Sequence, residues 1–119
     1  VVLEAAEAAL REAEAIAAAP LTVPATCTNG ICPKPVAGMA DRWTDSGFTG
    51  WQAATSTRPA LVTSQFIIED MGPQPVDGTC HLQIPVEPTC LLPLYRVTAQ
   101  AQATNARGTI VTLQSNIRQ

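Results

Sequence analysis

The last 26 residues, LYRVTAQAQATNARGTIVTLQSNIRQ (94–119), predict a β-hairpin and decide the fold class of this chain. Along the first strand, small or apolar residues alternate with polar ones, and successive side chains of a strand point to opposite faces. The first set is Tyr95, Val97, Ala99, Ala101 and Ala103, and the polar set is Arg96, Thr98, Gln100 and Gln102. After a turn over 105–108, the second strand alternates in the same way through Val111, Leu113 and Ile117. The small alanine side chains leave room for a helix to approach one face closely.

Residues 1–19 predict the helix that covers this face. They are rich in Ala, Glu and Leu, which favour helix, and neither Gly nor Pro occurs before Pro20. Apolar residues recur at helical spacing and form a narrow stripe, which consists of Leu3, Ala6, Leu10, Ala13 and either Ile16 or Ala17. We expect this stripe to pack on the sheet.

The middle of the chain predicts loops around one further long strand. Residues 20–60 contain five Pro and four Gly with little periodicity, which indicates a long, irregular connection. Residues 61–70 predict a strand, in which Val62, Ser64, Phe66 and Ile68 alternate with more polar neighbours. A second loop-rich stretch over 71–93 holds a short predicted strand at 81–84. The expected fold is one α+β domain over 1–119, a roll in which the N-terminal helix packs on an antiparallel sheet with long, disulfide-bearing loops.

Three of the five aromatic residues, Trp43, Phe48 and Trp51, lie within nine positions of the first connection. One interpretation is that they pack the connection onto the body of the domain. The other is that they form a surface for a partner, since long connections in compact domains are often functional.

Four cysteines, Cys27, Cys32, Cys80 and Cys90, predict disulfides and an oxidising compartment, because an even count in a short, loop-rich chain is typical of such proteins. We favour the local pairs Cys27–Cys32 and Cys80–Cys90, since turn residues lie inside each. The crossed pairings would close longer loops and stabilise somewhat more, so loop entropy does not decide between them. Zinc is the alternative, but only the first pair has the spacing that structural zinc ligands usually show.

The charge distribution argues against nucleic-acid binding. The formal net charge is −3, and all of it falls in residues 1–19, where four Glu stand against Arg11. The remainder is balanced, so the chain has no basic patch for phosphate. No run of 18 apolar residues occurs that could span a membrane.

Motifs for catalysis or for a cofactor are also missing from the sequence. The only histidine, His81, lies beside Cys80 in a loop that the second disulfide is expected to close, and no phosphate loop or nucleophile elbow occurs. Adjacent Glu69 and Asp70 should point to opposite faces, as solvated residues at a strand end rather than as a catalytic pair. We therefore expect a protein without enzymatic activity and without a cofactor.

One acidic stretch could supply oxygen ligands for calcium. Asp41 and Asp45 are followed by Ser46 and Gly47, but the spacing is not that of an EF-hand. Aspartates before Ser and Gly commonly accept hydrogen bonds within turns, so a turn-capping role is favoured.

Three segments carry a resemblance to a known family. These are AAEAALREAE (5–14), FIIE (66–69) and the hairpin strands YRVTA (95–99) and VTLQS (111–115), together with the CxxxxC spacing of Cys27 and Cys32. In these features the sequence resembles the periplasmic part of a type IV pilus minor pilin of the PilX class. It departs from major pilins, which close a C-terminal loop with a disulfide, because Cys80 and Cys90 here precede the final hairpin.

The resemblance implies a non-enzymatic assembly role. It implies a leader and an apolar helical half upstream of Val1, which would anchor the protein in the inner membrane, facing the periplasm, before it enters the extracellular pilus. The partners would be other minor pilins, pilus subunits and a large tip adhesin, and the function would be to prime pilus assembly at the tip. Leu3, Ala6 and Leu10 would then pack against partner helices. Two alternatives share this layout: an adhesion or aggregation factor displayed on the pilus, and a pseudopilin of a type II secretion system, often with calcium in a loop.

Overall fold

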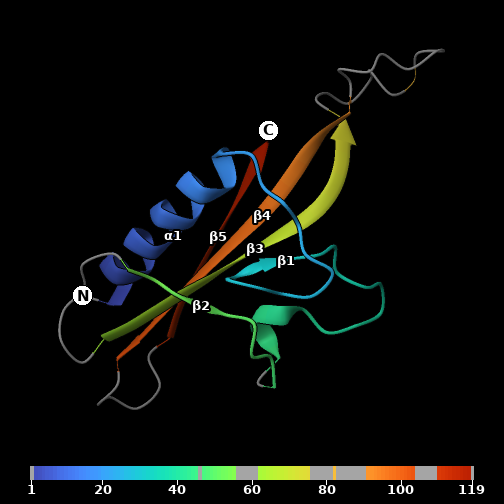
Figure 1. Ribbon diagram of the computed structural model, residues 1–119. Coiled ribbons are helices and arrows are strands. Elements are labelled where there is room, and N and C mark those ends of the chain that lie inside the picture. Colours follow the sequence, from blue (N-terminus) through green and yellow to red (C-terminus); the bar gives the residue numbers. More distant parts are fainter. Residues whose placement is uncertain are drawn as a thin grey trace.

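The computed structural model describes residues 2–45, 47–55, 62–75, 82, 91–103 and 110–118. Helix α1 (Val2–Ala18) comes first, and the connection after it holds strand β1 (Ile31–Cys32), the short 3-10 helix η1 (Arg42–Thr44) and strand β2 (Gln52–Ala53). Three long strands follow, namely β3 (Val62–Pro75), β4 (Leu91–Ala103) and β5 (Ile110–Arg118). The α+β class is confirmed, with one helix on a five-stranded sheet (Figure 1).

The sheet is mixed, so the expectation of a purely antiparallel sheet was wrong. Strands β3, β4 and β5 form an antiparallel series, whereas β1 and β2 both pair with the other edge of β3. Strand β2 is antiparallel to β3, but β1 is parallel to it, with Ile31 opposite Ile68. The physical reason is a tight turn just before β1. It reverses the chain, so that Ile31 and Cys32 run in the same direction as β3.

That turn lies inside the confirmed disulfide between Cys27 and Cys32. Asn29 (φ 53°) and Gly30 (φ 80°) both have positive φ, and Thr28 and Ile31 exchange backbone hydrogen bonds of 3.0 and 2.9 Å around them. A two-residue turn with this geometry favours Asn followed by Gly. A Cβ at position 30 would also lie only 2.6 Å from the Cβ of Gln52 on β2. The turn can therefore lie this close to β2 only with a glycine at this position.

Helix α1 lies along one face of β3, β4 and β5 (Figure 1). Its buried stripe consists of Ala5, Ala6, Ala9, Ala13 and Ala17, each no more than 2% exposed. The predicted stripe was therefore partly wrong, because Leu3 is 48% and Ile16 36% exposed. The helix approaches the alanines of β4 so closely that the smallest side chains, rather than the largest apolar ones, face the sheet.

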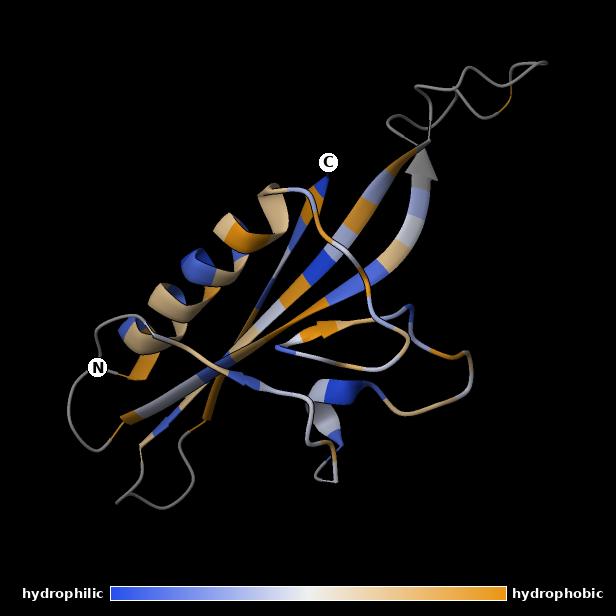
Figure 2. Cartoon of the chain, viewed as in Figure 1, coloured by the Kyte–Doolittle hydropathy of each residue, from blue (hydrophilic) through white to orange (hydrophobic). Residues whose placement is uncertain are grey.

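The predicted alternation of the hairpin is confirmed. Val97, Ala99 and Ala101 of β4 are buried beneath α1, and Phe66 and Ile68 lie opposite Ala99 and Val97 on β3. Figure 2 shows the corresponding hydrophobic and hydrophilic bands along β4. Strand β3 is longer than predicted: it continues to Pro75 past an irregularity between Asp70 and Pro73, where Gly72 has a φ of 78°.

Several predictions fall on residues that the structure does not describe. They are the second disulfide between Cys80 and Cys90, the short strand at 81–84, of which only residue 82 is described, and the hairpin turn over 105–108. Within the described residues, no helix has both the length and the apolar character needed to cross a membrane.

Candidate partner-binding surface

The face of the sheet opposite α1 is covered as well, by the connection that carries η1. Ile67 of β3 and Thr98 of β4 point to this side and are fully buried. Figure 1 shows η1 and the connection on the side of the sheet away from the helix. We call this side the loop face, defined by Gln65, Ile67, Glu69, Arg96, Thr98 and Gln100.

A buried ion cluster fastens the connection to the loop face. The carboxylate of Glu69 is fully buried, and its Oε2 accepts a hydrogen bond of 2.6 Å from Nη1 of Arg42 in η1. Its Oε1 accepts one of 3.0 Å from Nε of Arg96 on β4. Because a carboxylate that loses water needs charged partners, this cluster fixes where η1 lies. The expectation that Glu69 is solvated was therefore wrong, since the connection covers the face to which it points.

Trp43 extends this cluster toward the solvent. The guanidinium carbon of Arg96 lies 4.5 Å from the centroid of the Trp43 ring, which is a cation–π contact. The backbone oxygen of Trp43 also accepts a hydrogen bond of 3.4 Å from Nε2 of Gln100. Arg96 thus holds a carboxylate on one side and an aromatic ring on the other.

The three aromatic residues of the connection come together in one cavity. Trp43, Phe48 and Trp51 line a pocket of about 450 Å³ on the loop face, and each of them is half-buried. The rings of Phe48 and Trp51 are 6.0 Å apart between centroids and inclined at 67°. These rings pack on the sheet and also bound a cavity, and a partner surface formed by them stays a prediction. We call this cavity the aromatic pocket, and its other lining residues are Thr44, Asp45, Gln65, Gln100 and Ile110.

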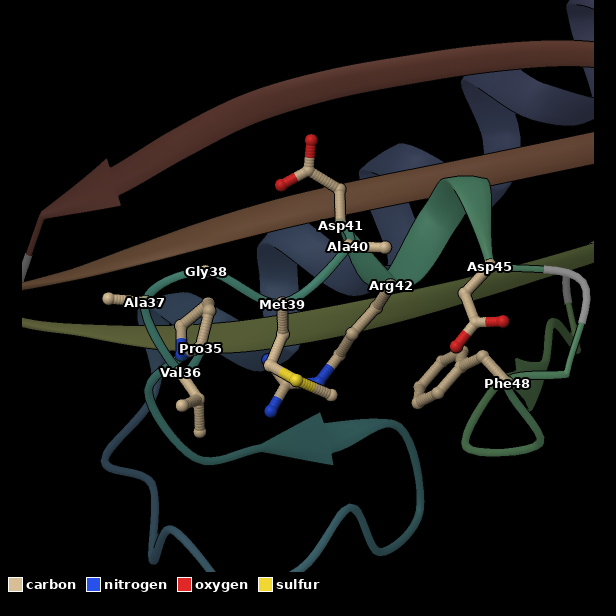
Figure 3. A pocket seen from close by; sticks show the side chains of 10 residues that line it. All are labelled: Pro35, Val36, Ala37, Gly38, Met39, Ala40, Asp41, Arg42, Asp45 and Phe48. Carbon is tan, nitrogen blue, oxygen red and sulfur yellow. The ribbon is translucent and has the colours of Figure 1, made fainter.

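A second cavity of about 470 Å³ lies within the connection itself (Figure 3). Figure 3 shows Pro35 and Val36 at one end of it and Asp45 and Phe48 at the other. Val36 is 69% and Met39 73% exposed. Since Asp45 and Phe48 also line the aromatic pocket, the two cavities share a wall.

The acidic residues of this stretch serve its turns. Oδ1 of Asp45 accepts a hydrogen bond of 2.9 Å from the backbone N–H of Gly47, which confirms the predicted turn role. Asp41 acts through its backbone oxygen, which accepts from both the N–H and the hydroxyl of Thr44. Among the described residues, no three His, Cys, Asp or Glu side chains converge as a metal site would require.

The residues predicted to pack against partner helices have different surroundings. Ala6 is fully buried against Val62 and Ala101 of its own sheet. Leu10 is half-buried and contacts the core, whereas Leu3 is exposed. Of the three, Leu3 alone is an exposed apolar residue, and Ile16 is a second one near the other end of α1.

The ion cluster is the feature that sequence reasoning missed. A signal for it existed, because Ile67 is apolar and points to the same side as Glu69, so both faces of β3 carry residues that need cover.

No family model matches this chain, and no curated protein or solved structure matches it either.

Proposed function

We propose that this protein is a pilin-like subunit that joins other minor pilins in the complex that primes type IV pilus assembly. The observation that carries the proposal is the half-embedded position of α1. Its alanine stripe is buried on the sheet, while Leu3 and Ile16, which flank this stripe on its two sides, are exposed. A helix held in this way can pack against the helices of neighbouring subunits, with the connection and the loop face turned outward.

The charge of the helix supports an interaction with a partner of opposite sign. Four Glu against Arg11 give residues 1–19 a net charge of −3, and Glu4 and Arg11 are exposed. Charge complementarity fixes register and orientation when helices associate. We therefore propose that the partner helix presents basic residues to this one.

A second function, display of a binding surface on the fibre for adhesion or aggregation, is favoured by the aromatic pocket. This pocket lies on the loop face, opposite α1, so a helix packed into a fibre core would leave it accessible. The two roles use different faces and can coexist. The type II pseudopilin alternative uses the same helix face as the assembly role.

Deletion of the gene in the source cell separates these roles. Loss of surface fibres with a retained intracellular pool of pilin subunits supports the priming role. Normal fibres with lost adhesion or aggregation support the display role and contradict priming. Normal fibres and normal adhesion with failed secretion of exoproteins would instead support the alternative function as a pseudopilin of a type II secretion system.

A pair of matched variants then tests the helix face. Leu3→Lys in the full-length protein should abolish fibres, because it removes an exposed apolar side chain of α1 and sets a positive charge against the basic partner helix. Val36→Lys is the control, since Val36 is even more exposed but lies in the connection. Both variants should accumulate to normal levels, and equal fibre numbers in the two would contradict the proposed use of α1.

A further inference from the structure

We propose that the aromatic pocket is a binding site for a neutral saccharide of one or two sugar units. This inference gives the display role its ligand class and rests on that role, but it does not depend on the assembly role. The pocket combines aromatic rings with amide and hydroxyl groups.

The aromatic side chains provide the surface on which a sugar ring stacks. The face of an aromatic ring is electron-rich, and the C–H groups on one side of a pyranose ring are weakly positive and apolar. Phe48 and Trp51 stand at 67° to each other, so one ring can serve as a floor and the other as a wall. Both are half-buried, which keeps their orientation fixed before a ligand arrives.

The polar side chains provide partners for hydroxyl groups. Gln100 is fixed at both ends, since its Oε1 accepts from Nε2 of Gln65 at 3.1 Å and its Nε2 donates to the backbone of Trp43. Gln65 lines the pocket, and its Oε1 has no hydrogen-bond donor among the described residues. Asp45 is oriented by its bond to Gly47 and can accept a second hydroxyl. A sugar supplies hydroxyl donors to such acceptors.

The charges around the pocket disfavour other ligands. Among the described residues that line it, Asp45 alone is charged, so these residues would repel an anionic ligand. An organic cation would use the face of an aromatic ring, but the guanidinium of Arg96 already occupies a face of Trp43. An extended proline-rich peptide docks along an aromatic-lined groove, whereas the rings of Phe48 and Trp51 are inclined at 67° to each other. The volume of about 450 Å³ falls in the range of small-ligand sites.

Tryptophan fluorescence is a direct probe, because both tryptophans of the chain line this pocket. The full 119-residue chain is titrated with N-acetylglucosamine, galactose, lactose and chitobiose. We expect a saturable change with at least one of them and a Kd on the order of 1 mM, as fits a shallow site for a small ligand. Tetramethylammonium and oligoproline serve as probes of the other ligand classes.

Variants locate the binding. Gln65→Ala should raise the Kd of the sugar about fivefold, because one hydrogen bond is lost. Trp51→Ala should raise it at least about tenfold, because the aromatic face is lost. Trp51→Phe keeps a ring and should retain most of the affinity, and Val36→Ala in the second cavity should leave it unchanged. Thermal unfolding confirms that each variant is folded.

Three outcomes would overturn the proposal. The first is no saturable change in fluorescence with any of the four sugars up to about 50 mM. The second is unchanged sugar binding in both Gln65→Ala and Trp51→Ala, and the third is binding of tetramethylammonium or oligoproline in place of sugars.

Failure of this proposal and failure of the display role are distinguishable. The first is measured on the isolated chain, and the second is measured as adhesion of cells that carry normal fibres.

Discussion

The guanidinium of Arg42 lies 2.6 Å from the carboxylate of Glu69, and this contact joins the connection to strand β3. Glu69 is fully buried, whereas the Arg42 side chain is 18% exposed. The carboxylate of Glu69 is therefore a buried charge, and its ion pair with Arg42 holds the connection that carries η1 in place. Both cavities depend on that position, because Arg42 lines one of them and the neighbouring Trp43 lines the other.

We expect Glu69→Gln to lower the free energy of unfolding by about 2–4 kcal/mol. The substitution leaves two arginines without their anion, and their partial exposure limits the cost because they can still reach water. The measurement is urea unfolding followed by circular dichroism. Asp41→Asn is the control, since Asp41 is exposed and makes no side-chain cap to η1, and it should change stability by less than about 0.5 kcal/mol. Equal effects of the two variants would mean that the cluster does not anchor the connection.

The alanine stripe of α1 should not tolerate larger side chains. Ala13→Leu adds volume where the helix meets the sheet, and we expect a loss of about 1–3 kcal/mol in unfolding free energy. Ala15→Leu on the exposed side has nearly the same helix propensity and should be neutral within about 0.5 kcal/mol. Thermal melts of both proteins test this. If Ala13→Leu were neutral, the close contact between α1 and β4 would be wrong.

Ser64 gives a prediction of the opposite sign. Its hydroxyl is buried on the helix side of β3 and has no hydrogen-bond partner in the described part of the chain. Since an unsatisfied buried hydroxyl is unfavourable, Ser64→Ala should stabilise the fold by about 1 kcal/mol. Ser115→Ala is the matched control, because the hydroxyl of Ser115 donates to Glu14 at 3.2 Å and its loss should not stabilise. Destabilisation by Ser64→Ala would show that the hydroxyl has a partner.

The periodicity of the sequence predicted which side chains of β4 and β5 face the helix, because strand alternation depends only on neighbouring residues. It did not predict the ion cluster, whose two pairs each join residues 27 positions apart. The same holds for β1, which is parallel to β3 only because a connection without periodicity folds back against that strand. For the candidate site, the sequence identified the aromatic residues but not the glutamines opposite them, since Gln65 and Gln100 become neighbours only through the β3–β4 register.

The number of free thiols tests the compartment that the cysteines predict. Titration with Ellman's reagent under denaturing, non-reducing conditions should find none, because Cys27 and Cys32 are bonded and the local pairing of Cys80 with Cys90 would use the other two. A pair of free thiols would contradict the second disulfide alone. Four would contradict an oxidising compartment and would favour zinc. Peptide mapping of the non-reduced chain then distinguishes local from crossed pairing.

Tyr95 makes the stability of the fold sensitive to alkaline pH. Burial raises the pKa of its phenol above the ordinary value, and the charge of Asp70, directly opposite on β3, raises it further. The folded state therefore holds this proton more tightly than the unfolded chain does. Stability should be unaffected below the unfolded pKa of about 10 and should fall as the pH rises from there through the folded pKa.

Absorbance of the phenolate measures this pKa directly, because Tyr95 is the only tyrosine. We expect the folded protein to titrate at higher pH than the chain unfolded in urea. Asp70→Asn should lower the folded pKa only partly, since burial is the larger cause. Tyr95→Phe removes the phenol, so the variant should lose less stability at alkaline pH than the unchanged protein does. Urea unfolding of both proteins, at one pH below and one pH above the unfolded pKa, measures this difference. Identical titration of folded and unfolded Tyr95 would mean that this phenol is solvated, and the helix would then not cover that end of the sheet.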